Sequence, residues 1–197
     1  MTPLSPQLLI ATTRALAGIG VNSEPGWKEA TLPALDARTV PGEARRVSWD
    51  ARFVLQCGYW AHYDHRTRTS SWPIPLTLTT PELAVFGKAR GVLYDEPEAG
   101  DIFLQYAAHR RAFVHSGVIV DVLERIVAGL TMHYNVYTVE ADTDEAGMLG
   151  GGKTMRVRRR LSPMLGDCFL RWVELEKRAC SGARGAYRSV RAAGRRA

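Results

Sequence analysis

Cysteine is scarce in this chain, and its scarcity excludes several classes of protein. The three cysteines, Cys57, Cys168 and Cys180, are odd in number and widely spaced. They therefore predict neither a disulfide framework nor the paired Cys-x-x-Cys ligands of a structural zinc site. We expect a reducing compartment.

Long hydrophobic runs are missing as well. No window approaches the run of about 18 apolar residues that a membrane-spanning helix needs, so we expect no membrane span. The first residues, MTPLSP, lack the basic start, apolar stretch and small-residue cleavage site of a secretory signal. We therefore expect no signal peptide, and a protein that is cytoplasmic when made.

Most of the chain also lacks an excess of charge of either sign. The 197 residues carry a net charge of +6, and residues 176–197 alone hold seven basic residues and one acid, so the rest is neutral. A chain of this length buries about 70% of its unfolded surface, which is enough for one core. We expect one domain, residues 1–175, and a basic C-terminal extension, residues 176–197.

Four arginines of this extension would share one face if it were helical. They are Arg184, Arg188, Arg191 and Arg195. Such a stripe would suit teichoic acid, nucleic acid, an anionic membrane or an acidic partner protein. Three glycines in the same segment lower its helix propensity, and a solvated tail is the alternative.

Helical spacing of apolar residues dominates the first half of the chain. A helix is predicted from about Leu8 to Gly18 or Gly20, and another from Thr80, as N-cap, to about Arg90. Between them, Ser48 is placed to cap a helix whose buried stripe is Trp49, Phe53, Val54, Cys57 and Trp60.

From Gly100 the pattern changes to period two with many β-branched residues. This pattern predicts strands over residues 101–104, 113–122, 134–141, 154–160 and 168–173. Helices followed by a run of strands favour an α+β fold, with the N-terminal helices packed on a C-terminal antiparallel sheet of about five strands.

Four segments resemble, in the right order, the CHAP family of cysteine- and histidine-dependent amidohydrolases and peptidases, which cut peptidoglycan. Residues 49–57 (WDARFVLQC) are similar to the family's nucleophile helix, Trp-Cys-Ala-x-Phe-Val with a second Cys. Residues 100–102 (GDI) with 115–120 (HSGVIV), and then 139–143 (VEADT), are similar to its later motifs. The resemblance implies a papain-like fold, with His115 as general base and Glu140 as the acid that orients it. Trp49, Ser116 and Asp142 would line the groove.

At the nucleophile position, however, the chain has Asp50 instead of cysteine. A carboxylate at a helix N-terminus stays ionised and attacks an amide poorly. Three interpretations remain open. The site is inactivated, or Asp50, His115 and Glu140 bind a metal that activates water, or the alignment is shifted and a cysteine reaches His115.

Strand geometry supports a meeting of His115 and Glu140 independently of the resemblance. If strands 113–122 and 134–141 form an antiparallel hairpin, pairing His115 with Glu140 puts Val120 opposite Asn135 and Val122 opposite His133. Residues 123–132 would then form the connection. Opposed side chains have Cβ atoms roughly 5 Å apart, so Glu140 could orient the imidazole.

Two other motifs suggest different chemistry. His62, Asp64 and His65 lie close together, as metal ligands do, but the segment also suits a polar helix end. Residues 147–154 (GMLGGGKT) match the P-loop pattern, yet the alternating Arg156, Arg158 and Arg160 that follow predict a strand. We interpret the glycines as a hairpin turn, with the arginines on one sheet face, either lining an anionic groove or facing water.

The expected function is that of a CHAP-like protein acting at or binding the bacterial cell wall, with catalysis impaired at Asp50. Its partners would be peptidoglycan or another anionic wall polymer, and the missing signal implies delivery, for example by a phage or phage-like particle that the basic tail contacts. We expect no cofactor and no metal. A structural or interaction protein with the tail as its docking element is the alternative, and nucleotide binding through residues 147–154 is a lesser one.

Overall fold

The computed structural model describes residues 5–20, 49–64, 66–143 and 149–175. Side chains are described at these positions except 14–20, 49, 142–143 and 149–155. The basic extension, the Ser48 cap, His65, Cys180 and the side chains of Trp49 and Asp142 therefore lie outside the described residues.

The three predicted helices are present. They are α1 (Pro6–Gly20), α4 (Trp49–Ala61) and α5 (Thr80–Arg90). Phe53, Val54 and Cys57 are buried along α4, as the helical stripe predicts. Trp60 does not belong to that stripe. It is 37% exposed and packs edge-on against Tyr59 and Tyr63, because the buried stripe continues from Cys57 to Ala61, four residues on, and Trp60 lies beside it.

Helix α5 begins one residue earlier than the sequence indicates. Its N-cap is Thr79, whose backbone N–H donates to the Glu82 carboxylate at 2.8 Å, and Pro81 occupies the first turn. Gly91 ends the helix with a left-handed φ of 64°. Thr80 is therefore the first residue of the helix itself, and its side chain is buried.

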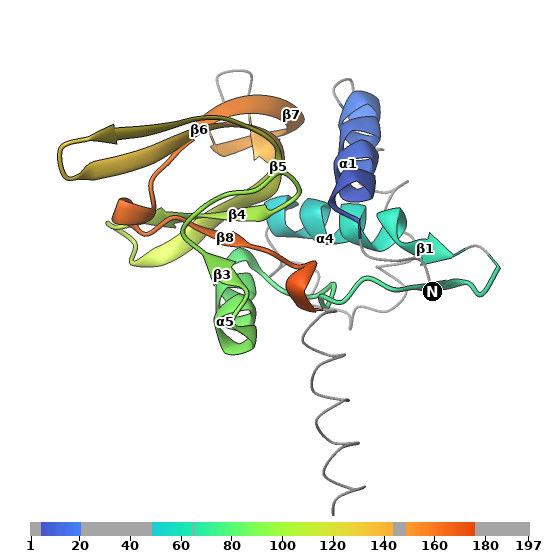
Figure 1. Ribbon diagram of the computed structural model, residues 1–197. Helices are drawn as coiled ribbons and strands as arrows, with labels where there is room; N and C mark the ends of the chain where they lie inside the picture. Colours follow the sequence, from blue (N-terminus) through green and yellow to red (C-terminus); the bar gives the residue numbers. More distant parts are fainter. Residues whose placement is uncertain (1–4, 21–48, 65, 144–148, 176–197) are drawn as a thin grey trace, which may run out of the picture.

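The second half forms a six-stranded antiparallel sheet, so the fold is α+β (Figure 1). Along the sheet the order is β3-β8-β4-β5-β6-β7. The strands are β3 (Leu93–Tyr94), β4 (Ile102–Ala107), β5 (Ala112–Ala128), β6 (Thr131–Thr143), β7 (Leu149–Leu161) and β8 (Cys168–Leu170). All five predicted strands occur, and the sixth, β3, is too short to produce a sequence pattern.

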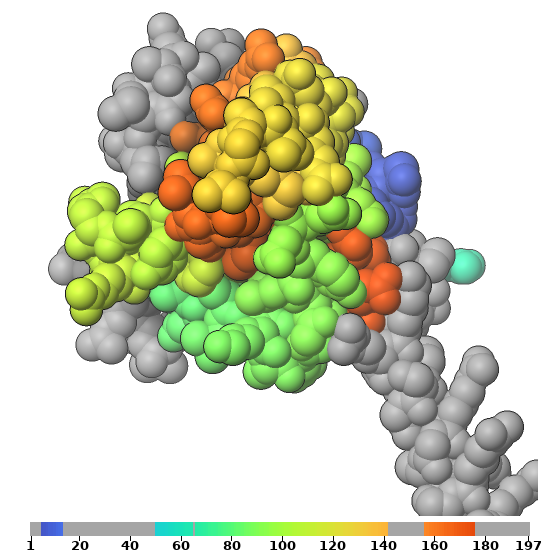
Figure 2. Space-filling model, turned by 60° about the vertical axis from the view of Figure 1, so that its left-hand side comes forward, coloured from blue at the N-terminus to red at the C-terminus, as the bar shows by residue number. Residues whose placement is uncertain are grey.

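The register of the β5–β6 hairpin differs from the predicted one. Glu140 is opposite Gly117 instead of His115, and the strands continue to Ala128 and Thr131 instead of ending at residues 122 and 134. The hairpin turns at residues 129–130 instead of over 123–132, which moves the pairing by four residues at Asn135, now opposite Glu124 and not Val120. Two register shifts within β5 then reduce the offset to two residues at Glu140. In Figure 2 the residues around the hairpin turn, in yellow, lie at the surface.

A short hairpin follows α4 where a polar helix end was expected. Strands β1 (Tyr63–Asp64) and β2 (Thr69–Ser70) form it. His62 is buried, with its ring stacked on Trp72 and edge-on to Trp172, and Asp64 accepts the backbone N–H of Arg66 at 2.8 Å. Both residues therefore have structural roles, and they do not converge on a metal position.

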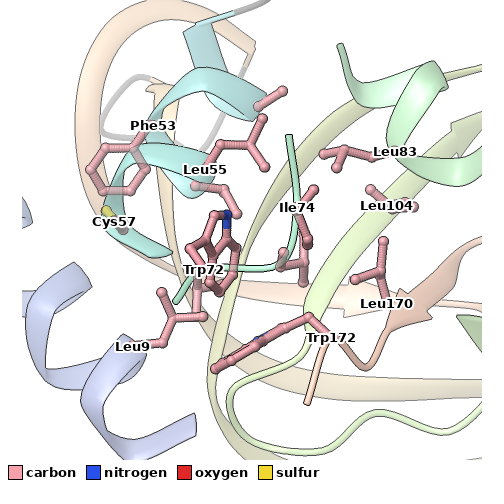
Figure 3. Close-up of a cluster of buried hydrophobic side chains, with 14 of the residues drawn as sticks. Leu9, Phe53, Leu55, Cys57, Trp72, Ile74, Leu83, Leu104, Leu170 and Trp172 are labelled. Atoms are coloured by element: carbon pink, nitrogen blue, oxygen red, sulfur yellow. The ribbon is translucent and has the colours of Figure 1, made fainter. Parts of the chain in front are cut away.

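The main core lies between the sheet and the helices. Figure 3 shows side chains from α1, α4 and α5 meeting those of the sheet, with Trp72 and Trp172 between them. A second, smaller cluster covers the opposite face of the sheet and consists of Phe103, Ile119, Tyr134, Val136, Leu161 and Phe169. Among the described residues, no helix has the length and apolar character to cross a membrane.

Candidate functional site

Asp50 lies in the first turn of α4, where the helix dipole favours a negative charge. It is only 2% exposed. Its Oδ2 accepts hydrogen bonds from the backbone N–H of Ser116 at 2.7 Å, from Thr80 Oγ1 at 2.9 Å and from Ser116 Oγ at 3.1 Å. The pairing of β5 with β6 begins at Gly117, so the N–H of Ser116 that Asp50 binds belongs to the residue just before the paired part of β5 and β6. The carboxylate thus joins α4, α5 and β5.

His115 lies between two carboxylates. Its Nδ1 is 3.5 Å from Asp50 Oδ2, and its Nε2 is 2.8 Å from Glu140 Oε2. The imidazole is 2% exposed. The structure therefore brings together the three side chains singled out in the sequence, Asp50, His115 and Glu140, with the imidazole between the two carboxylates.

Glu140 is fully buried and is held by more than the histidine. Arg159 on β7 donates from Nε to Oε1 at 2.7 Å and from Nη2 to Oε2, and the Thr138 hydroxyl donates to Oε1. Burial alone would raise the pKa of this carboxyl. The hydrogen bonds from His115 and Arg159 and the charge of Arg159 outweigh burial, so the pKa lies below its ordinary value.

Gly117 makes the contact between Glu140 and His115 possible. The two residues are not directly opposed, so the Glu140 side chain must pass over residue 117 to reach the ring. A Cβ at this position would lie 2.8 Å from Glu140 Cγ and 2.6 Å from Phe103 Cε1. The absence of a side chain at Gly117 thus provides the space that the changed register requires.

The lowered pKa of Glu140 predicts an acid-sensitive contribution to stability. A carboxyl whose folded-state pKa is depressed stabilises the fold above its unfolded pKa of about 4.3 and loses that contribution as the pH falls through the folded value. We expect the difference in unfolding free energy between wild type and Glu140→Gln to be largest above pH ~5 and to shrink below pH ~4. Urea unfolding of both proteins across this range measures it, and a difference that grows on acidification would contradict the assignment.

Three residues were not expected at the site from the sequence. Thr80, Thr138 and Arg159 come from three different elements, and each donates to one of the two carboxylates. No local motif marks them, because their partners are distant in sequence. The one available signal was the position of Arg159 between Arg158 and Arg160. Successive residues of a strand point to opposite faces of the sheet, so Arg159 faces away from the side on which these two exposed arginines lie.

The two described cysteines lack the properties of a nucleophile. Burial raises the pKa of the Cys57 thiol to about 12, and burial together with Asp167 and Asp95 does the same for Cys168. Both thiols are therefore protonated at neutral pH. Asp50, and not Cys57, is the α4 residue that faces His115, which leaves the shifted-alignment interpretation without support among the described residues.

The contacts of these side chains also do not suit a metal ion. Both oxygens of Glu140 accept hydrogen bonds from Arg159, whose positive charge opposes a cation. Nε2 of His115 is used by Glu140. Within the described part of the chain, no group of three His, Cys, Asp or Glu side chains could hold a metal.

The remaining predicted groove residues are placed unequally. Ser116 is fully buried and binds Asp50, so it supports the site and does not line an open surface. Trp49 and Asp142 belong to α4 and β6, but their side chains are not described. Arg184, Arg188, Arg191 and Arg195 lie outside the described residues.

The Gly-Asp-Ile segment has a structural explanation. Asp101 pairs with Arg171, whose Nη2 is 3.1 Å from Oδ2, and accepts the N–H of Glu98 at 2.9 Å. Burial raises the pKa of the Asp101 carboxyl above its ordinary value despite the Arg171 hydrogen bond. The O=C of Gly100 accepts Trp172 Nε1 at 2.8 Å. These contacts tie the start of β4 to the segment after β8.

The P-loop match falls in a strand. Leu149–Leu161 forms β7, which pairs with β6, so Lys153 and Thr154 do not open a helix as phosphate binding by this motif requires. The glycines were predicted to form a hairpin turn, which is wrong for Gly150, Gly151 and Gly152, since they lie within β7. Gly147 is outside the described residues.

Comparison of the chain with protein-family models, with curated proteins and with solved structures finds no match.

Proposed function

We propose that this protein is a papain-like domain of CHAP type that binds at the bacterial cell wall and has lost catalysis at the nucleophile position. The observation that supports the proposal most is the arrangement of Asp50, His115 and Glu140. A helix N-terminus presents a side chain to one ring nitrogen, and an acid from the neighbouring strand binds the other. This is the arrangement of a cysteine–histidine centre with a carboxylate in place of the thiol.

The chemistry at the centre favours loss of catalysis. Oδ2 of Asp50 accepts three hydrogen bonds, which stabilise the carboxylate and make it a weaker nucleophile. The wall polymer would then be retained by surfaces outside this centre, and the basic extension would dock the protein to a phage or phage-like particle.

Purified peptidoglycan tests both parts of the proposal. We expect wild type to co-sediment with sacculi and to leave them intact, whereas Asp50→Cys restores clearing because a thiol at a helix N-terminus beside a histidine forms a thiolate. Clearing should disappear in Asp50→Cys/His115→Ala. Asp121→Cys places a thiol on the exposed part of β5 and serves as the matched control.

Two outcomes would contradict the proposal. Clearing by wild type that His115→Ala abolishes would mean that Asp50 supports chemistry. Failure of folded wild type to sediment, together with no clearing by Asp50→Cys, would remove the link to the wall. The closed, hydrogen-bonded centre would then favour the second candidate, a structural or interaction protein that uses this fold as a scaffold.

A further inference from the structure

Three arginines form a row on one face of β7, the edge strand of the sheet. Arg156, Arg158 and Arg160 are exposed and alternate with Val157 and Arg159, so their side chains leave the same face. Alternate residues of a strand repeat at roughly 6.7 Å, so the row carries three positive charges over roughly 13 Å. Arg159 faces the other side, where it binds Glu140.

Strand β6 holds two of these arginines in place. The guanidinium carbon of Arg156 lies 4.2 Å from the centroid of the Tyr137 ring. Nη2 of Arg160 donates to His133 Nδ1 at 3.0 Å. An arginine that is already positioned loses less conformational entropy when it binds an anion.

The charge of the row is not neutralised within the described part of the chain. The arginines that form ion pairs there are Arg125, Arg159 and Arg171. The acids on the same face of the sheet are Asp121 and Glu124 of β5, which are opposite Tyr137 and Asn135 of β6. Strand β5 is two strands, or roughly 10 Å, away from β7. Glu124 accepts a hydrogen bond from Asn135 at 3.2 Å.

We propose that this arginine row binds a phosphodiester-linked wall polymer that carries no bases, of the poly(glycerol phosphate) kind. The proposal rests on the wall-facing function above and names the polymer that this face would take. A guanidinium pairs with phosphate through two parallel hydrogen bonds, and a row of three suits a repeating anion. Tyr137 already has Arg156 across its ring, so it offers little surface on which a base would stack, which disfavours nucleic acid.

The full-length chain and a fluorescent poly(glycerol phosphate) chain provide the test. We expect R156Q/R158Q/R160Q to weaken binding about tenfold or more at physiological salt, and to reduce the slope of log K against log salt by about 2, as the loss of three phosphate contacts predicts. The control is R66Q/K88Q/R110Q, which removes the same charge from exposed positions on other elements. It should retain most of the affinity.

Three results would overturn the proposal. They are an equal loss in both triple variants, no loss in the β7 variant, or tighter binding of single-stranded DNA with the same number of phosphates. Co-sedimentation with phosphate-free sacculi separates this proposal from the proposed function. The β7 variant should still sediment with those sacculi. If the arginine row does not bind the polymer, sedimentation of the wild type with phosphate-free sacculi is therefore unaffected.

Discussion

Replacing Glu140 by alanine is expected to lower the free energy of unfolding by about 3–5 kcal/mol, the loss typical of a buried ion pair that is broken from one side. The substitution leaves the Arg159 guanidinium, whose side chain is 13% exposed, without its carboxylate. It also removes the partner of Nε2 on a buried imidazole, and each unpaired buried polar group costs free energy. Urea unfolding followed by tryptophan fluorescence measures the effect.

Two further substitutions give this measurement its controls. Glu140→Gln keeps the shape of the side chain and should cost less than alanine. Glu124→Ala removes an exposed carboxylate from the neighbouring strand and should change stability by no more than about 0.5 kcal/mol. A loss below about 1 kcal/mol for Glu140→Ala would mean that Glu140 is not buried in this network.

Gly117→Ala is expected to cost about 1–3 kcal/mol, because the site has no room for a methyl group. The added Cβ would lie 2.6 Å from Phe103 Cε1, 2.8 Å from Glu140 Cγ and 2.9 Å from the backbone O=C of Val139. The last contact involves backbone, which moves less readily than a side chain. The Glu140 side chain must then shift, and its contact with His115 weakens.

A double-mutant cycle isolates this effect. Glu140→Gln should cost less in the Gly117→Ala background than in wild type, because the first substitution has already weakened the contact that the second removes. Gly129→Ala is the control. Gly129 has a positive φ of 60° but nothing within 4 Å, so its cost should add to that of Glu140→Gln. Additivity of Gly117→Ala with Glu140→Gln would contradict the role assigned to Gly117.

The parts of the fold with a regular hydrophobic period could be predicted from the sequence. Helix α4 was predicted by the spacing of Phe53, Val54 and Cys57, and β4 to β8 by alternation and β-branched residues. Each of these patterns arises because one face of the segment is buried, so it can be read from the segment's own residues without knowing which other segments it packs against.

Features that depend on two distant segments could not be predicted in this way. The register of β5 against β6 was wrong because the prediction placed the connection over residues 123–132, whereas the strands continue to Ala128 and Thr131. Two shifts within β5 also change the pairing between the turn and Glu140. The contact of His115 with Glu140 was nevertheless predicted, although through a direct pairing that does not occur. Glu140 reaches the ring across Gly117, and side chains two residues apart on a strand share a face.

The donors that complete the site had no sequence signal of their own. Thr80 lies at the start of α5, where a threonine is expected to cap the helix, and the cap is its neighbour Thr79. Arg159 sits within a run of arginines that looks like a solvated surface. Only the pairing of β6 with β7 places it against Glu140.

The protonation and environment of the His115 ring test the central claim most directly, since the claim is that this imidazole is buried with Nε2–H donated to Glu140. Nitrogen-detected NMR of histidine-labelled protein should show for His115 an Nε2-bound proton that exchanges slowly with water, and Glu140→Gln should shift it strongly. A freely exchanging ring whose resonances do not respond to Glu140→Gln would contradict the account.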